Sequence, residues 1–217
     1  MHIGVFDSGR GGEIIGRYLE KLLPEHNFTV INDLDNVPYG EKSDDEVFSL
    51  TEKALKRLLA SCPIIVIACN TATAAAIPRL REKYPATKFI GVEPMIKPAA
   101  AATKNRHITV LATPSTLRSS RYKDLKDRYA SGVTIDEPNT RGWPKLIDDD
   151  KKQQIDLSEI SDAAANGSDT IVLACTHFID LYDILKSQFP SAEILEPSDA
   201  IARQTAKLID AITAQQP

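Results

Sequence analysis

Eight short runs of apolar, mostly β-branched residues are the feature that most constrains the fold of this chain. Apart from polar residues at some of their ends and a few internal threonines, the runs are apolar without alternation, which is typical of strands buried on both faces of a parallel sheet. The runs are His2–Phe6, Phe28–Ile31, Ile64–Ala68, Lys88–Val92, His107–Ala112, Val133–Ile135, Thr170–Ala174 and Glu193–Leu195. Helical patterns, with apolar residues returning at three and four, lie between most of them. Examples are Gly12–Leu23, Asp44–Ala60, Thr73–Lys83, Thr116–Tyr129, Ile155–Asn166 and Ile201–Ile212. This alternation predicts an α/β fold with right-handed crossovers.

The chain also repeats itself at a nearly constant spacing. "IIVIAC" ends at Cys69 and "TIVLAC" at Cys175, an offset of 106. "IGVFD" and "ITVLA" are 105 residues apart, and "GVEP" and "ILEP" are 103 apart. We therefore predict two pseudosymmetric, doubly wound α/β domains, the first formed by residues 1–92 plus 198–217 and the second by residues 93–197. Because no low-complexity linker separates them, we expect their parallel sheets to face a shared cleft.

Composition excludes several classes of protein. The 26 basic and 30 acidic residues give a net charge of −4 and form no basic stripe, which argues against a nucleic-acid partner. No apolar stretch approaches the length of a membrane span. The start "MHIGVFDSG" lacks the basic and apolar regions of a signal peptide. Three cysteines cannot all pair, which favours a reducing compartment, so we expect a cytoplasmic protein.

Polar residues that follow the predicted strands are the candidates for chemistry, because ligands of open α/β sheets bind at the carboxyl ends of the strands. These residues are Asp7, Ser8, Cys69, Asn70, Thr71, Thr113, Cys175, Thr176 and His177. If the halves face each other, one thiol lies on each wall and a two-base reaction at one carbon becomes feasible. A free thiol has a pKa of about 8.5, so thiol and thiolate are both accessible. Asp7 and His177 are placed to hold or receive the thiol protons, and the hydroxyl and amide side chains suit carboxylates.

The same residues also have simpler interpretations. A cysteine at a strand end is more often packing, but two at equivalent positions reverse that preference. Cys62, before Pro63, has no such setting and is expected to be structural. A zinc site of Cys69, Cys175 and His177 is disfavoured by its C-x-H spacing, and "DSGRGG" does not match a nucleotide-binding loop. We therefore expect no metal and no bound nucleotide, and we expect Asp148–Lys152 to be a solvated turn.

Seven phrases together resemble the glutamate racemase family of the aspartate/glutamate racemase superfamily. In order they are "IGVFDSGRGG", "VPYGEKS", "IACNTATAAA", "GVEPMIKPAA", "LATPSTLRS", "VLACTHF" and "DAIARQTAKLI". The resemblance implies cofactor-independent interconversion of L- and D-glutamate, which supplies D-glutamate for peptidoglycan, and suggests a homodimer. It implies that Cys69 acts on the D-enantiomer and Cys175 on the L-enantiomer, with Asp7 and His177 beside them. The substrate-binding positions that it implies are Asp7, Ser8, Tyr39, Gly40, Asn70, Thr71, Thr116, Thr176 and His177.

The chain departs from the family pattern in several places. Arg10 replaces a small apolar residue and is expected at the surface or an interface, and Ser115 replaces a common glycine before Thr116. The stretch 133–154 is short, and "GWPKLIDDD" aligns too loosely to assign the family's acidic residue near the second cysteine. Three alternatives stay open: a racemase of aspartate or another amino acid, a decarboxylase of related fold, and a non-catalytic amino-acid-binding module. A decarboxylase needs only one thiol, so the second cysteine argues against it.

Overall fold

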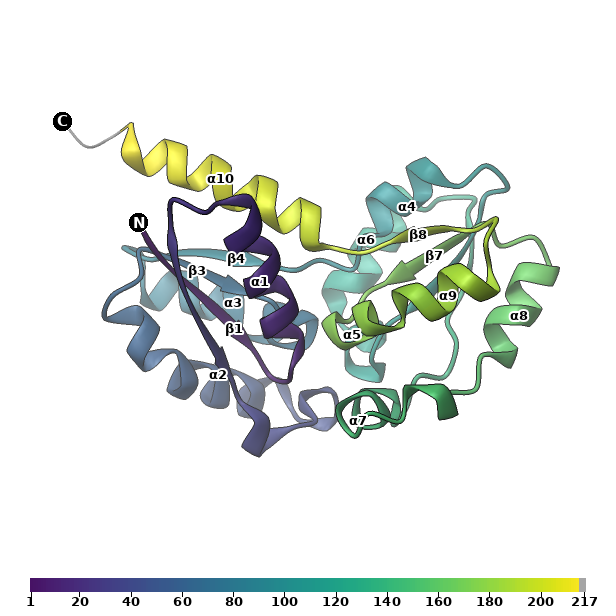
Figure 1. The fold of residues 1–217 in the computed structure, drawn as a ribbon, viewed down its shortest axis with the longest axis horizontal. Coiled ribbons are helices and arrows are strands. Elements are labelled where there is room, and N and C mark those ends of the chain that lie inside the picture. The colour runs from purple at the N-terminus through teal and green to yellow at the C-terminus, as the bar shows by residue number, and fades with distance from the viewer. Residues whose placement is uncertain (215–217) are drawn as a thin grey trace. The chain divides into compact units, whose positions relative to one another are not determined.

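A computed structural model describes residues 1–214 of the chain, which divide into two compact units (Figure 1). The first unit comprises Met1–Val92 together with the chain from Ser198 onward, and the second comprises Glu93–Pro197. Each unit contains one four-stranded parallel sheet with helices on both faces. No helix within residues 1–214 is both long and apolar enough to cross a membrane.

The sheet of the first unit has the strand order β2-β1-β3-β4. Its strands are β1 (His2–Asp7), β2 (Asn27–Asn32), β3 (Ile64–Ile67) and β4 (Lys88–Gly91). All pairs are parallel, with Ile3 opposite both Phe28 and Ile64. Every residue of β3 is buried, as expected for a strand with other strands on both sides and helices on both faces.

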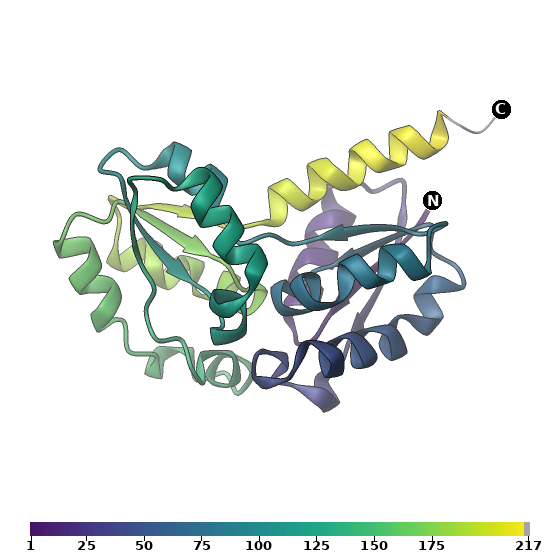
Figure 2. The ribbon, with the colours of Figure 1, turned by 180° about the vertical axis from the view of Figure 1, so that it is seen from behind.

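Two helices cover each face of this sheet. On one face, α2 (Asp44–Leu59) and α3 (Asn70–Lys83) pack on Phe6, Ile65 and Ile67. Successive strand residues point to opposite faces, so the intervening side chains meet the other pair of helices. That pair is α1 (Gly11–Leu22) and α10 (Ser198–Thr213), which lie side by side in both views (Figures 1 and 2). The short turns η1 (Leu34–Asn36) and η2 (Tyr39–Glu41) connect β2 to α2.

The second unit repeats this topology with the strand order β6-β5-β7-β8. Its strands are β5 (His107–Leu111), β6 (Thr134–Asp136), β7 (Thr170–Leu173) and β8 (Glu193–Leu195). Its helices and turns are α4 (Ile96–Ala102), α5 (Pro114–Arg118), α6 (Ser120–Tyr129), α7 (Trp143–Asp148), η3 (Lys152–Gln154), α8 (Ser158–Ala165), η4 (Thr176–Leu181) and α9 (Tyr182–Gln188). Ile171 and Leu173 pack with α7, α8 and α9, whereas Val172 packs with α4 and α6 on the opposite face.

The α/β class, the eight strands and the parallel sheets predicted from the sequence are confirmed. The predicted helix Thr116–Tyr129 is wrong as a single element, because the chain extends at Ser119 (φ −62°, ψ 145°) and divides it into α5 and α6. The Ser119 hydroxyl accepts a hydrogen bond from the backbone N–H of Tyr122 at 3.1 Å and so begins α6. The predicted helix Ile155–Asn166 begins later, at Ser158.

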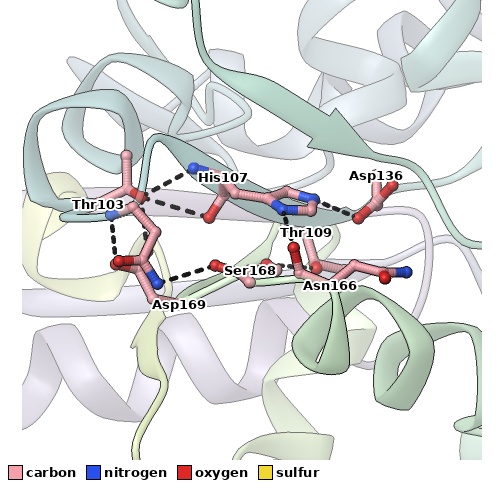
Figure 3. A network of polar contacts seen from close by, with 9 residues as sticks. Thr103, His107, Thr109, Asp136, Asn166, Ser168 and Asp169 are labelled. Carbon is pink, nitrogen blue, oxygen red and sulfur yellow. Dashed lines mark hydrogen bonds and ion pairs between the residues drawn. The ribbon is translucent and has the colours of Figure 1, made fainter.

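Paired polar side chains occupy the amino-terminal edge of the second sheet (Figure 3). Asp169, directly before β7, accepts hydrogen bonds from Thr103 Oγ1 at 2.5 Å and from the backbone N–H of Asn105 at 2.9 Å. His107 Nε2 lies 2.6 Å from Asp136 Oδ2. Burial raises the pKa of Asp169, but these hydrogen bonds outweigh it and hold that pKa below its usual value. These contacts join neighbouring segments of the second unit and stabilise its fold. They lie at the opposite end of the strands from Cys175.

Candidate active site

In the first unit, Asp7, Ser8 and Cys69 are brought together because β1 and β3 are adjacent and parallel, so that both end at the same edge of the sheet. The Ser8 hydroxyl lies 3.1 Å from the Cys69 sulfur, and Asp7 Oδ1 accepts a hydrogen bond from the backbone N–H of Ser8 at 2.8 Å. Asp7 is fully buried and Cys69 is 6% exposed. The thiol therefore sits in a polar setting that is almost closed to water.

Cys69 is also the N-cap of α3, a helix of 14 residues. Its sulfur accepts a hydrogen bond from the backbone N–H of Ala72 at 3.4 Å. The first N–H groups of a helix carry partial positive charge and favour an anion. This position therefore suits a sulfur that alternates between thiol and thiolate.

Asn70, the first residue of α3, has a buried side-chain amide that is unsatisfied. Neither Oδ1 nor Nδ2 has a hydrogen-bond partner, although the residue is only 5% exposed. Buried polar groups are nearly always paired, so an unsatisfied amide beside Cys69 is a place for a polar ligand group. Thr71, the next residue, is buried as well.

Tyr39 is held by Asp33 in the connection after β2. The Tyr39 hydroxyl donates to Asp33 Oδ2 at 2.7 Å. Burial and the neighbouring carboxylate raise the pKa of Tyr39 far above its ordinary value, so the phenol stays protonated. Gly40 follows in η2. Sequence reasoning missed Asp33, although its position directly after a strand was the same signal that identified Asp7.

In the second unit, Cys175 and His177 follow β7, and Thr116 lies after the adjacent strand β5. The Cys175 sulfur is 3.8 Å from His177 Nδ1, and both residues are 7% exposed. Thr176 and Thr116 are buried, and the Thr116 hydroxyl lies 3.0 Å from that of Thr113. The imidazole is placed to exchange a proton with the thiol.

Asp148, at the end of α7, joins this group from a segment that was expected to be a solvated turn. Its Oδ2 lies 3.5 Å from His177 Nε2, and its Oδ1 is buried without a hydrogen-bond partner. The prediction holds for the exposed residues Asp149–Lys151 but is wrong for Asp148, whose side chain is 21% exposed. The packing of α7 singles out one carboxylate from three adjacent aspartates, and composition alone does not.

The remaining singled-out residues lie elsewhere. Arg10 is exposed immediately before α1, and Ser115 is half-buried in α5. Cys62 is buried between α2 and β3, 3.6 Å from the Ser61 hydroxyl. Burial raises the pKa of the Cys62 thiol, which suits a packing role.

Comparison with known proteins shows what this arrangement resembles. A glutamate racemase from Ectopseudomonas mendocina (strain ymp) is 39% identical over 214 residues, covering 95% of this chain and 81% of that protein. The crystal structure of Escherichia coli glutamate racemase in complex with L-glutamate and the activator UDP-MurNAc-Ala superposes with a TM-score of 0.85. It is 31% identical, and the match covers 96% of this chain and 82% of that one. A glutamate racemase isoform from Bacillus anthracis superposes with a TM-score of 0.79 at 25% identity, over 96% and 81% of the two chains.

The sequence model of the Asp/Glu/hydantoin racemase family matches residues 13–205, which is most of the chain. The matched span extends over both units and includes the site residues Cys69, Asp148, Cys175 and His177. The chain therefore belongs to the Asp/Glu/hydantoin racemase family.

Proposed function

We propose that this chain interconverts L- and D-glutamate without a cofactor, by two-base proton transfer between Cys69, Cys175 and the substrate. One observation carries the proposal: each unit places a cysteine two residues after the end of its third strand in sequence, beside side chains able to exchange protons. The product, D-glutamate, would supply peptidoglycan synthesis.

The reaction transfers one proton from the Cα atom and one proton to it. With D-glutamate, the Cys69 thiolate removes the Cα proton and becomes a thiol, which leaves a carbanion conjugated with the α-carboxylate. The Cys175 thiol protonates the opposite face and becomes a thiolate, and the product is L-glutamate. The reverse reaction exchanges the two roles. Two-base transfer at one carbon needs one thiol on each face of that carbon, so the proposal requires both cysteines to reach the same substrate.

The surroundings of Cys69 support its role as a base. The Ser8 hydroxyl at 3.1 Å and the Ala72 N–H at 3.4 Å are both able to donate to a thiolate. Hydrogen bonds to an ionised acceptor are stronger than those to a neutral one, so these donors favour the reactive form. The buried carboxylate of Asp7 orients Ser8 through its backbone N–H.

Cys175 is served by a histidine and an aspartate instead. His177 Nδ1 faces the sulfur at 3.8 Å, and His177 Nε2 faces Asp148 Oδ2 at 3.5 Å. A carboxylate behind an imidazole fixes its orientation and stabilises the imidazolium that forms when it takes a proton. Such distances are long for hydrogen bonds and commonly shorten when a substrate binds.

Donors for the substrate come from residues that the resemblance identified. Asn70 contributes an unsatisfied buried amide, and Thr71, Thr116 and Thr176 contribute buried hydroxyl groups. Positioned acid–base catalysis supplies about 10²–10⁴-fold. Removing a proton from a carbon beside a carboxylate needs more than that, so hydrogen bonds to the developing negative charge must supply the rest.

Proton exchange in D₂O tests this proposal. NMR would follow loss of the Cα proton signal from L- and D-glutamate, and then from L- and D-aspartate. We expect exchange from both glutamate enantiomers and none after Cys69→Ala or Cys175→Ala. Cys62→Ala is the matched control, because it removes a buried cysteine that has no catalytic neighbours. Exchange from aspartate alone would change the substrate, and near-normal turnover in either catalytic variant would exclude the mechanism.

The same proposal includes a cellular compartment, an oligomeric state and a class of ligand for the enzyme. All three cysteines are free thiols, which suits the reducing cytoplasm. We expect a homodimer, as the resemblance implies, and light scattering after size-exclusion chromatography tests it. The partner of the site is a small amino acid and not a nucleic acid or a membrane.

A further inference from the structure

Trp143 is the only tryptophan of the chain, and it begins the helix that carries Asp148. The residue is 6% exposed, and its ring meets the ring of Phe178 edge-on, with centroids 5.7 Å apart and planes inclined at 67°. Pairs of aromatic rings prefer an edge-to-face or offset-stacked arrangement to a face-to-face stack. The contact therefore fixes the direction of α7 as well as filling space.

Phe178 lies next to His177, at the end of the group of Asp148, His177 and Cys175 that is opposite to Asp148. It follows His177 directly and is fully buried, and its backbone N–H donates to the carbonyl oxygen of Cys175 at 2.9 Å. That hydrogen bond closes the turn in which His177 stands. Fixing the ring of Phe178 therefore fixes the backbone that presents the imidazole to the Cys175 sulfur.

We propose that Trp143 is a positioning residue, which holds Asp148 and His177 in line with the Cys175 sulfur through its edge contact with Phe178. This inference rests on the proposed racemase function and extends it to a residue outside the group formed by Cys175, His177 and Asp148. It assigns a role to "GWPKLIDDD", a stretch that aligns only loosely with the family pattern.

The geometry leaves little tolerance for misplacement. Six residues of α-helix span about 7.5 Å from the first to the last Cα, so tilting α7 at Trp143 displaces Asp148 at its other end. His177 Nε2 lies 3.5 Å from Asp148 Oδ2, and His177 Nδ1 lies 3.8 Å from the Cys175 sulfur. Both distances are already at the long limit of hydrogen bonding. The ion pair between Lys145 and Asp149 is largely exposed and contributes little to holding the helix.

Two substitutions separate positioning from packing. Trp143→Leu keeps an apolar side chain but removes the ring contact, whereas Trp143→Phe keeps an aromatic ring facing Phe178. Ile160→Ala is the matched control, because Ile160 on α8 is buried in the same apolar cluster without belonging to α7 or η4. Thermal melts would establish that each variant is folded before its kinetics are compared.

For Trp143→Leu we expect kcat to fall about tenfold with KM changed less than twofold, because a misplacement near 1 Å can cost up to about 100-fold. The primary deuterium isotope effect measured with L-[2-²H]glutamate should rise, because proton removal by Cys175 becomes slower. Trp143→Phe should recover most of kcat, and Ile160→Ala should change neither quantity. Equal losses in Trp143→Leu and Ile160→Ala, or unchanged kcat in a folded Trp143→Leu variant, would overturn the inference.

A second measurement does not depend on turnover. The chain has four histidines, so the ¹⁵N signals of the His177 ring can be assigned by comparison with His177→Gln. At a fixed pH these signals should shift in Trp143→Leu and stay in place in Ile160→Ala. Shifted signals in a protein that does not exchange the Cα proton would refute the racemase proposal but retain the positioning role. Unshifted signals would refute the positioning role alone.

Discussion

Gly12 lets the start of α1 lie directly against Asp7, and Gly12→Ala is the perturbation with the clearest expected result. A Cβ atom at this position would lie 2.9 Å from the Cβ of Asp7 and 2.5 Å from Oδ1 of Asn32. Ordinary carbon–carbon contacts are about 3.5–4.0 Å, so Asp7 or the helix must move by about 0.6–1 Å. The Asn32 amide can rotate away, but the Cβ of Asp7 is fixed to a buried strand.

Two effects of opposite sign determine the stability of this variant. Alanine favours a helix over glycine by up to about 1 kcal/mol, and overpacking costs about 1–3 kcal/mol. We therefore expect a net loss of about 0–2 kcal/mol in the free energy of unfolding. Asp7 orients Ser8, which contacts the Cys69 sulfur, so kcat should fall about tenfold or more.

Gly16→Ala supplies the matched control on the same helix. A Cβ at Gly16 would lie 2.5 Å from Cγ2 of Val30, so the clash is equally severe but involves no residue of the proposed site. Racemisation of glutamate, followed by circular dichroism, and unfolding in urea would be measured for both variants. If Gly12→Ala keeps kcat within twofold of the unmodified enzyme, or if both variants lose kcat equally, the reasoning about Asp7 is refuted.

Substitutions at three other residues test the roles assigned to single side chains. Asp148→Asn should lower kcat about 10–100-fold without unfolding the chain, because positioned acid–base catalysis is worth about 10²–10⁴-fold and His177 loses the carboxylate that orients it; unchanged kinetics would show that Asp148 does not assist His177. Arg10→Gln should change kcat/KM no more than about twofold, because the Arg10 side chain is exposed and a charge in water interacts weakly with its surroundings; a tenfold fall would instead place the guanidinium on the substrate. Asp169→Asn should destabilise the protein at pH 7 in urea unfolding, by about 1–3 kcal/mol, and the difference should shrink below about pH 4. The sign follows because the pKa of Asp169 is depressed in the folded state, so its contribution is present above the unfolded pKa and is lost as pH falls through the folded one; a difference independent of pH would contradict this.

The larger elements of the fold were readable from the sequence because burial on both faces leaves a continuous apolar run. β3 and β7 are the clearest examples, and every residue in them is buried. The short helices α4, α7 and α9 were not identified, because six or seven residues are too few to establish a helical period. The Trp-Pro pair at the start of α7 was the available signal, since proline favours the first turn of a helix.

The site was partly predictable for a related reason. Asp7, Cys69 and Cys175 were identified because position after a strand is a property of the sequence pattern. Asp148 was missed, because its contact with His177 depends on how α7 packs, and no local pattern distinguishes it from the two aspartates that follow. Tertiary packing distinguishes Asp148 from Asp149 and Asp150, whereas the local sequence pattern does not.

The two sheets share one strand order, yet they give their cysteines different neighbours: a serine for Cys69 and a histidine for Cys175. Mirror-image amino acids have equal free energies in water, so the equilibrium constant of racemisation is one. At that value kcat/KM must be identical in the two directions, however unlike the two thiols are. The different surroundings of Cys69 and Cys175 therefore cannot make kcat/KM differ between the two enantiomers. They can be detected only as differences in kcat and in KM, each measured separately with L- and D-glutamate.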